Sequence, residues 1–285
     1  MNKNAALKLT RLLIITLVVS LLANLALGGV IFKIKKDRII EVSNLVLDKF
    51  FRLTYSDKNI QQMLEEMNRT KLAVSIDGKI ETGSSKVIKI LILGNSLSYH
   101  LSVEDSEWDH ASGMAASDIN SDYVHLLMTD ISKAKNVSIV FKVINLVDFE
   151  RNYKTYDLKK ISTFVNFQPD ITLFQLGDNA RLESTEDIES FSSYYQKLVS
   201  LFGSSKRIIA TTYFPSKNKN KAIESVARST NSFVVDLSHL TLLDKANFAK
   251  SEKNYSNKSI GMHPGNIGMR NIANEFFLTL NLVAD

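Results

Sequence analysis

From residue 87 to the C-terminus, short apolar runs alternate with longer amphipathic stretches. The apolar runs show no polar alternation and cover residues 87–93, 137–146, 171–176, 207–212 and 233–236. Between them, apolar residues recur at helical spacing in the segments 122–134, 158–166, 187–202, 219–230 and 268–282. Continuously apolar strands separated by helices are typical of a parallel sheet that is covered on both faces. We therefore expect a three-layer, flavodoxin-like α/β domain with a parallel five-stranded sheet over residues 87–285.

A much longer apolar segment lies near the N-terminus. Residues 12–32 form 21 consecutive positions without a charge, and a helix of that length crosses a hydrocarbon core of about 30 Å. A cleaved signal peptide is the alternative, because residues 26–28 resemble a small-residue cleavage site. Signal peptides have apolar cores of about 7–15 residues, and this run continues through residues 30–32. The pattern favours an uncleaved N-terminal transmembrane helix that, with its basic flanks, occupies residues 1–38.

Four small or polar residues recur at every fourth position of this apolar segment and share one face of the predicted helix. They are Thr16, Ser20, Asn24 and Gly28. Small and hydroxyl side chains at this spacing let transmembrane helices approach closely, which would allow weak self-association. A single span also tolerates a few such residues, so both interpretations stay open.

Residues 39–86 form a spacer between this helix and the α/β domain. Apolar positions at helical spacing in 39–51 and around 59–68 predict two short juxtamembrane helices. The apolar run 72–76 is followed by Asp77-Gly78, a pair that favours a tight two-residue turn, so we expect a small hairpin there.

The positive charge of the chain belongs to the flanks of the apolar segment. Residues 1–38 carry seven basic and one acidic side chain, a net of +6, whereas the whole chain carries +5, so the remainder nets −1. A nucleic-acid-binding domain needs a basic surface of its own, and this composition argues against one.

The orientation in the membrane is less clearly indicated by the charges. Three basic residues precede the apolar segment and four follow it, so the basic residues do not settle which end is cytoplasmic. A short N-terminal tail before a large domain favours a single-pass protein of the bacterial cytoplasmic membrane with that domain outside the cytoplasm. The chain has no cysteine, which rules out disulfides and thiol catalysis.

Two polar motifs directly follow two of the predicted strands. Ser96 ends Gly94-Asn95-Ser96 after the first strand, and Asn179 ends Gly177-Asp178-Asn179 after the third. The carboxyl ends of parallel strands meet at one edge of the sheet, so both motifs are expected at the same crevice. His263 lies in a third motif before the last predicted helix. A hydroxyl, an amide and an imidazole are the groups needed to attack an ester and to hold the resulting oxyanion.

These segments resemble the conserved blocks of the SGNH (GDSL-type) hydrolase family. The similar stretches are residues 94–98, 108–117 around Gly113, 177–179 and 263–269. The resemblance implies Ser96 as the nucleophile and His263 as the base. It also implies an oxyanion hole formed by the main-chain N–H groups of Ser96 and Gly113 and the amide of Asn179.

The sequence departs from the family pattern at three positions. Asn95 replaces the commoner aspartate before the serine, and Ala180 follows Asn179 where the family usually has aspartate. Ile260 occupies the position, three residues before the histidine, where the family commonly places the third member of its triad. The expected carboxylate is therefore missing.

A histidine base still needs an acceptor on its second ring nitrogen to fix the tautomer. We expect a Ser96–His263 dyad in which the carbonyl of Ile260 or of a close neighbour accepts that bond. The alternative is that a carboxylate from the preceding loop, Asp244 or Glu252, folds into place.

The chain shows no phosphate-binding loop, no His-Glu-x-x-His motif and no acidic calcium loop. The resemblance implies a serine esterase without cofactor or metal that hydrolyses O-acyl esters. Together with the predicted anchor at residues 12–32, it indicates a membrane-anchored enzyme that acts on O-acetyl esters of a cell-envelope or exported glycan. An O-acyltransferase with the same serine and histidine, and a non-catalytic envelope protein that kept the fold, are the two alternatives.

Overall fold

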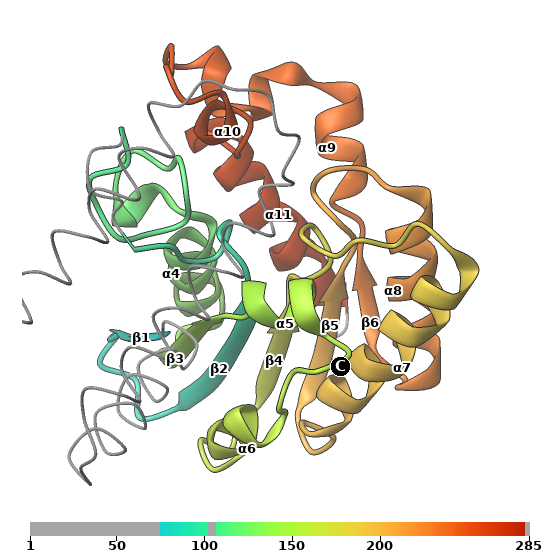
Figure 1. The fold of residues 1–285 in the computed structure, drawn as a ribbon. Coiled ribbons are helices and arrows are strands. Elements are labelled where there is room, and N and C mark those ends of the chain that lie inside the picture. The colour runs from blue at the N-terminus through green and yellow to red at the C-terminus, as the bar shows by residue number, and fades with distance from the viewer. Residues whose placement is uncertain (1–74, 102–106, 283–285) are drawn as a thin grey trace, which may run out of the picture. The chain divides into compact units, whose positions relative to one another are not determined.

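The computed structural model describes residues 75–101 and 107–282, which form a single sheet with helices on both faces (Figure 1). The predicted transmembrane segment 12–32 and the two predicted helices of the spacer lie outside these described residues. Within the described ranges, no helix is long and apolar enough to cross a membrane.

The sheet has six strands in the order β1-β3-β2-β4-β5-β6. The strands are β1 (Ser75–Ile80), β2 (Val87–Gly94), β3 (Ser138–Asn145), β4 (Ile171–Phe174), β5 (Lys206–Ala210) and β6 (Phe233–Val235). Strands β2 to β6 pair in parallel, which confirms all five predicted strands. Strand β1 pairs antiparallel with β3, so the sheet is mixed.

The predicted hairpin around Asp77-Gly78 is wrong. The chain runs straight through these two residues as strand β1, in register with β3 from Ser75 opposite Ile144 onward. The glycine is needed for packing, because a Cβ atom at Gly78 would lie 2.1 Å from the buried ring of Phe141. The last part of the presumed spacer therefore forms an edge strand, and the sheet begins before residue 87.

The described region contains eight α-helices, five between the strands and three after β6. They are α4 (Tyr123–Lys135), α5 (Val147–Asn152), α6 (Lys159–Val165), α7 (Thr185–Ser200), α8 (Lys217–Ser229), α9 (Ser238–Leu243), α10 (Lys258–Gly261) and α11 (Asn266–Leu282). The five predicted helices correspond to α4, α6, α7, α8 and α11. The helices α5, α9 and α10 were not predicted, because six or fewer residues are too short to show a helical period.

The sheet divides the buried apolar side chains into two clusters. On one face, side chains of α4, α9 and α11 pack on the strands, and the rings of Tyr123 and Phe276 stack at 5.7 Å. On the other face, α5, α6, α7 and α8 cover the sheet with a cluster that contains Phe149, Phe191 and Tyr195. Figure 1 shows this arrangement, which makes the domain a three-layer α/β structure.

The strand order reverses between β2 and β4. From β2 the chain passes to β3 on one side of the sheet and then returns to β4 on the other side of β2. Open α/β sheets bind ligands at such a reversal, beyond the carboxyl ends of the strands. The loops after β2 and β4 lie side by side at this point, and they carry Ser96 and Asn179.

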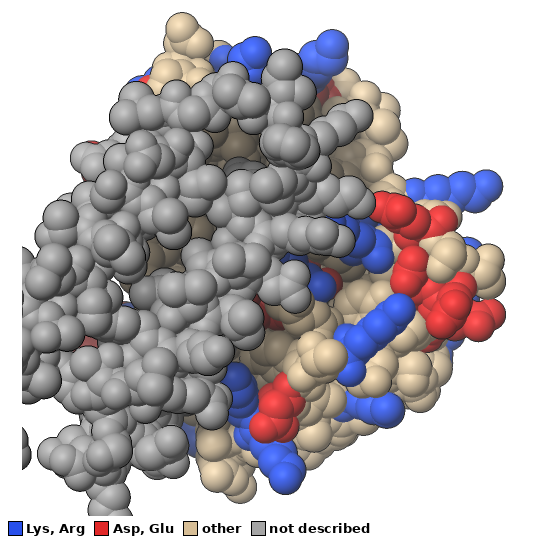
Figure 2. Space-filling view, viewed as in Figure 1, with Lys and Arg blue, Asp and Glu red and all other residues tan. Residues whose placement is uncertain are grey.

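Charged side chains of both signs are interspersed on the described part of the face shown in Figure 2, where α7 and its neighbours lie. Acidic residues occupy the first turn of α7, and Lys197 lies in its last turn. The visible part of this face is therefore not dominated by charges of one sign.

Gly78→Ala should lower the free energy of unfolding by about 1–3 kcal/mol, because the new methyl group would overlap the Phe141 ring in a well-packed layer. Urea denaturation of the two proteins measures the change. Gly203→Ala is the matched control, since its Cβ would meet no atom closer than 3.5 Å. Equal stability of the Gly78 variant and the control would contradict the described packing of β1.

Candidate active site

Ser96 lies on a tight turn directly after β2. The side-chain oxygen of Asn95 accepts the N–H of Leu97 at 3.0 Å, and the carbonyl of Asn95 accepts the N–H of Ser98 at 3.0 Å. Gly94 lets the turn fold back on itself, because a Cβ atom there would lie 1.8 Å from the Ser98 hydroxyl oxygen. The turn leaves the Ser96 side chain partly exposed between buried neighbours.

The hydroxyl of Ser96 meets the imidazole of His263. The Ser96 Oγ atom lies 3.0 Å from His263 Nε2, and His263 Nδ1 lies 2.8 Å from the carbonyl oxygen of Ser259. A carbonyl can only accept a hydrogen bond, so Nδ1 carries the ring hydrogen. In the neutral ring, Nε2 then has a free lone pair that faces the Ser96 hydroxyl.

The acceptor for His263 is the carbonyl of Ser259, the residue before the expected Ile260. The two alternative carboxylates are used elsewhere: Asp244 accepts the N–H of Ala246 at 2.8 Å, and Glu252 accepts two main-chain N–H groups at the start of α11. A helix N-terminus has unpaired N–H groups that a carboxylate stabilises, which explains the place of Glu252. Within the described residues, no carboxylate contacts the ring of His263.

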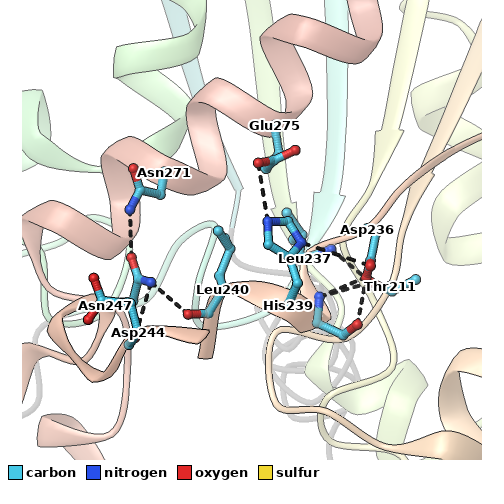
Figure 3. A network of polar contacts seen from close by, with 10 residues as sticks. Thr211, Asp236, Leu237, His239, Leu240, Asp244, Asn247, Asn271 and Glu275 are labelled. Carbon is cyan, nitrogen blue, oxygen red and sulfur yellow. Dashed lines mark hydrogen bonds and ion pairs between the residues drawn. The ribbon is translucent and has the colours of Figure 1, made fainter. Parts of the chain in front are cut away.

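The segment that carries His263 is fixed by main-chain bonds to the preceding loop. Ala249 N–H donates to the His263 carbonyl at 2.8 Å, and Gly265 N–H donates to the Asn247 carbonyl at 3.1 Å. Asn247 is buried, and its side-chain oxygen accepts the amide of Asn271 on α11 at 2.7 Å (Figure 3).

The same view shows the hydrogen bonds that connect the segments after β5 and β6. Thr211 Oγ1 donates to Asp236 Oδ1 at 2.8 Å after the two strands, and His239 on α9 lies 3.4 Å from Glu275 on α11 (Figure 3). His263 therefore lies on a loop that hydrogen bonds tie to α9, α11 and the sheet.

Burial lowers the pKa of His263 below its usual 6.5, an effect that the hydrogen bond to the Ser259 carbonyl opposes. At neutral pH the imidazole is therefore uncharged, which is the state that a general base requires. Activity that depends on His263 should fall as the pH drops through this lowered pKa.

Asn179 lies on the loop after β4 and reaches a buried carboxylate. Its Nδ2 atom donates to Glu150 Oε2 at 2.7 Å. The other oxygen of Glu150 accepts Asn95 Nδ2 at 3.1 Å and the N–H of Gly177. Gly177 has a φ of +126°, a conformation that favours glycine. The loops of Ser96 and Asn179 are therefore joined through Glu150.

Glu150 is fully buried. Burial, with a smaller contribution from the neighbouring charge of Asp178, raises the pKa of Glu150 to about 7, and burial also raises the pKa of Asp178. The pKa of Glu150 in the folded state lies above its unperturbed 4.5, so ionising this group costs stability. The contribution of protonated Glu150 to the stability of the fold is fully present below about pH 4.5 and is lost as the pH rises through about 7.

Gly113 lies against the Ser96 turn, because Met114 N–H donates to the Ser96 carbonyl at 2.8 Å. Its own N–H points to Asp122 Oδ2 at 3.3 Å and would have to leave that carboxylate to reach an oxyanion. By contrast, no hydrogen bond among the described residues uses the Ser96 N–H. The geometry thus favours the Ser96 N–H and the second amide hydrogen of Asn179 as oxyanion donors.

The described residues hold no group of three or more acidic or histidine side chains that could bind a metal ion. The candidate site contains the Ser96 hydroxyl, which is paired with the neutral imidazole of His263, and two N–H donors on neighbouring loops, the Ser96 main chain and the Asn179 amide. This set of groups suits acyl transfer through a covalent intermediate.

No protein-family model matches the chain, and no curated protein matches it either. Solved structures with a similar fold include the Clostridium thermocellum family 3 carbohydrate esterase, with 18% identity, 70% of this chain and 97% of that chain covered, and a TM-score of 0.47. A lipase/acylhydrolase from Enterococcus faecalis has 16% identity, covers 68% and 95%, and has a TM-score of 0.44. An acetyl xylan esterase has 16% identity, covers 68% and 100%, and also has a TM-score of 0.44. Lipases and carbohydrate esterases are thus among the solved structures that this fold resembles.

Asn95→Asp, which restores the commoner residue of the SGNH pattern, should destabilise this protein. It would replace the amide that donates to Glu150 with a third carboxylate, next to Glu150 and Asp178. We expect a loss of about 3 kcal/mol at pH 8. At pH 5 the loss should be smaller, because Glu150 is then protonated and can donate.

Urea denaturation at both pH values measures this effect, with the exposed Asn254→Asp variant as the control for an added charge. A loss that is equal at pH 5 and pH 8 would contradict the carboxylate pairing described for Glu150.

Proposed function

We propose that the protein is a serine esterase of the SGNH type in which Ser96 attacks the carbonyl carbon of an ester. The observation that carries this proposal is the 3.0 Å contact of Ser96 Oγ with His263 Nε2, in a ring whose Nδ1 hydrogen bonds to the Ser259 carbonyl. This arrangement has the correct tautomer for proton transfer from the hydroxyl.

In the proposed reaction, His263 takes the Ser96 proton as the C–O bond forms and then returns it to the departing alcohol. The N–H of Ser96 and the amide of Asn179 stabilise the oxyanion. Water, deprotonated by the same imidazole, then hydrolyses the acyl-serine. The Ser259 carbonyl orients the ring but carries no full charge, so it stabilises the imidazolium less than a carboxylate would. We therefore expect modest turnover.

The substrate class in this proposal is an O-acyl ester, and the narrower proposal is an O-acetyl group on a cell-envelope or exported glycan. The narrower part is supported by the resemblance of the sequence blocks and by the predicted anchor, which would keep the domain close to the envelope. Transfer of the acyl group to a sugar hydroxyl would use the same acyl-serine, and measuring released acetate against acetylated sugar distinguishes the two reactions.

Ser96→Ala should lower turnover of an aryl acetate by about 10³-fold or more and abolish covalent labelling by a serine-directed phosphonate. Thermal stability should change little, because the side chain is partly exposed. The assay uses the full-length chain purified in detergent. Ser204→Ala, at an exposed position, is the control and should keep full activity. Undiminished activity of the Ser96 variant would refute its role as nucleophile.

We further propose that residues 12–32 anchor the chain in a bacterial cytoplasmic membrane, with the esterase domain on the outer side. The support is the uncharged 21-residue segment between basic clusters. In intact spheroplasts, added protease should degrade the domain. A chain that is released as a soluble protein would exclude the anchor, and protection of the domain until the membrane is permeabilised would exclude the orientation.

A further inference from the structure

Glu150 is a fully buried acid at the first turn of α5, and it contacts both loops of the candidate active site. The contacts come from Asn95 on the Ser96 loop and from Gly177 and Asn179 on the loop after β4. In each of these bonds a nitrogen donates to a carboxylate oxygen. An ionised carboxylate, which can only accept, therefore satisfies all of its neighbours.

This bonding pattern decides which way the amide of Asn179 faces. Opposite an ionised Glu150, Asn179 has to present its Nδ2 atom, as it does at 2.7 Å. Nδ2 carries two hydrogens, so one of them stays available for an oxyanion. A protonated Glu150 has a hydroxyl group that needs an acceptor, and this favours the flipped amide, with its oxygen toward Glu150.

We propose that Glu150 is a positioning residue of the ester-cleaving site: its carboxylate holds Asn179 in the orientation that donates to the oxyanion, and protonation of Glu150 removes that orientation. The inference rests on the proposed esterase function and adds to it a residue that does not touch the substrate and acts through Asn179.

Two titratable groups from neighbouring elements face Glu150. Asp178, on the loop after β4, adds a negative charge, and Tyr195 on α7 contributes a buried hydroxyl whose pKa is raised by burial and by the charge of Glu150. Burial and Asp178 together bring the pKa of Glu150 to about 7, whereas the pKa of His263 lies below 6.5. The acid limb of kcat/KM should therefore lie near pH 7 and follow Glu150.

The test measures kcat and KM for an aryl acetate from pH 5 to 9, with the full-length chain in detergent. Glu150→Gln keeps the shape of the side chain but replaces one of the two oxygens that accept hydrogen bonds from Asn95, Gly177 and Asn179 with an amide nitrogen, which can only donate. At pH 8 it should lower kcat by about 10²–10³-fold, the usual effect of losing one oxyanion donor, and leave KM within about twofold. The kcat/KM of this variant should no longer decrease as the pH falls through about 7. Glu183→Gln, at an exposed acid, is the control and should change neither quantity.

A double-mutant cycle separates positioning from general structural support. If Glu150 acts through Asn179, then Glu150→Gln should cause no further loss of kcat in a chain that already carries Asn179→Ala. An equal loss in both backgrounds would overturn the proposal, because the effect would then not pass through Asn179.

Asn179→Ala by itself covers the case in which Glu150→Gln does not fold. Without the amide, the ionisation of Glu150 no longer affects the oxyanion, so the acid limb should move from about pH 7 to below 6.5. A limb that stays near pH 7 in this variant would overturn the proposal.

The wild-type measurements separate this inference from the proposed function. A wild-type chain with neither turnover nor phosphonate labelling would refute both. A wild-type chain whose turnover depends on Ser96, but whose kcat and acid limb are the same after Glu150→Gln, would refute the role of Glu150 alone.

Discussion

A buried carboxylate at the reversal point of the sheet is the interaction on which the candidate site depends. Glu150 has no exposed surface, and removing a charged group from water is expensive unless hydrogen bonds replace the water. The donors come from the turn after β2 and the loop after β4, through Asn95, Gly177 and Asn179. Satisfying one acid therefore fixes the two loops that carry Ser96 and Asn179.

In the part of the chain that the structure describes, no carboxylate contacts the His263 side of the site. His263 reaches Ser96 from the loop between α10 and α11, and the carbonyl of Ser259 orients its ring. The nearby acid Glu252 stabilises the first turn of α11 instead. Among the residues that the structure describes, the charge that triads place behind the histidine thus has no counterpart next to His263, while two acids, Glu150 and Asp178, lie next to Asn95 and near Asn179. The pH dependence of such a site should be set more by its oxyanion side than by its base.

The sequence predicted the parts of the fold that follow from local periodicity. The five parallel strands and the five longer helices are confirmed, since continuous apolar runs and helical spacing are properties of the segment itself. The pair Asp77-Gly78 misled the prediction, because the glycine serves a contact with Phe141, which is distant in sequence. Ser96 and His263 lie at hydrogen-bonding distance, as the resemblance of their motifs to SGNH hydrolases predicted. Local periodicity alone could not have predicted this contact.

The role of Glu150 could not be predicted from the sequence. Glu150 lies four residues after an apolar run, where a glutamate is ordinarily exposed to solvent. It is buried here because the loops after β2 and β4 cover it, and these loops are distant in sequence. Its position after the second strand, at the same edge as the motifs, was the one available signal. The sequence did predict that the carbonyl of Ile260 or of a close neighbour orients His263, and that carbonyl belongs to Ser259. Which of these neighbouring carbonyls faces the ring depends on the path of the short helix α10, which no side-chain pattern encodes.

We propose that Ser96, His263 and Asn179 act together on one acyl group at this edge of the sheet, and a crystal structure of the phosphonate-treated full-length chain can test this. We expect a bond between phosphorus and Ser96 Oγ, with a phosphonyl oxygen within about 3.2 Å of both the Ser96 nitrogen and Asn179 Nδ2. A phosphonate bound to another residue, or a phosphonyl oxygen directed away from Asn179, would contradict it.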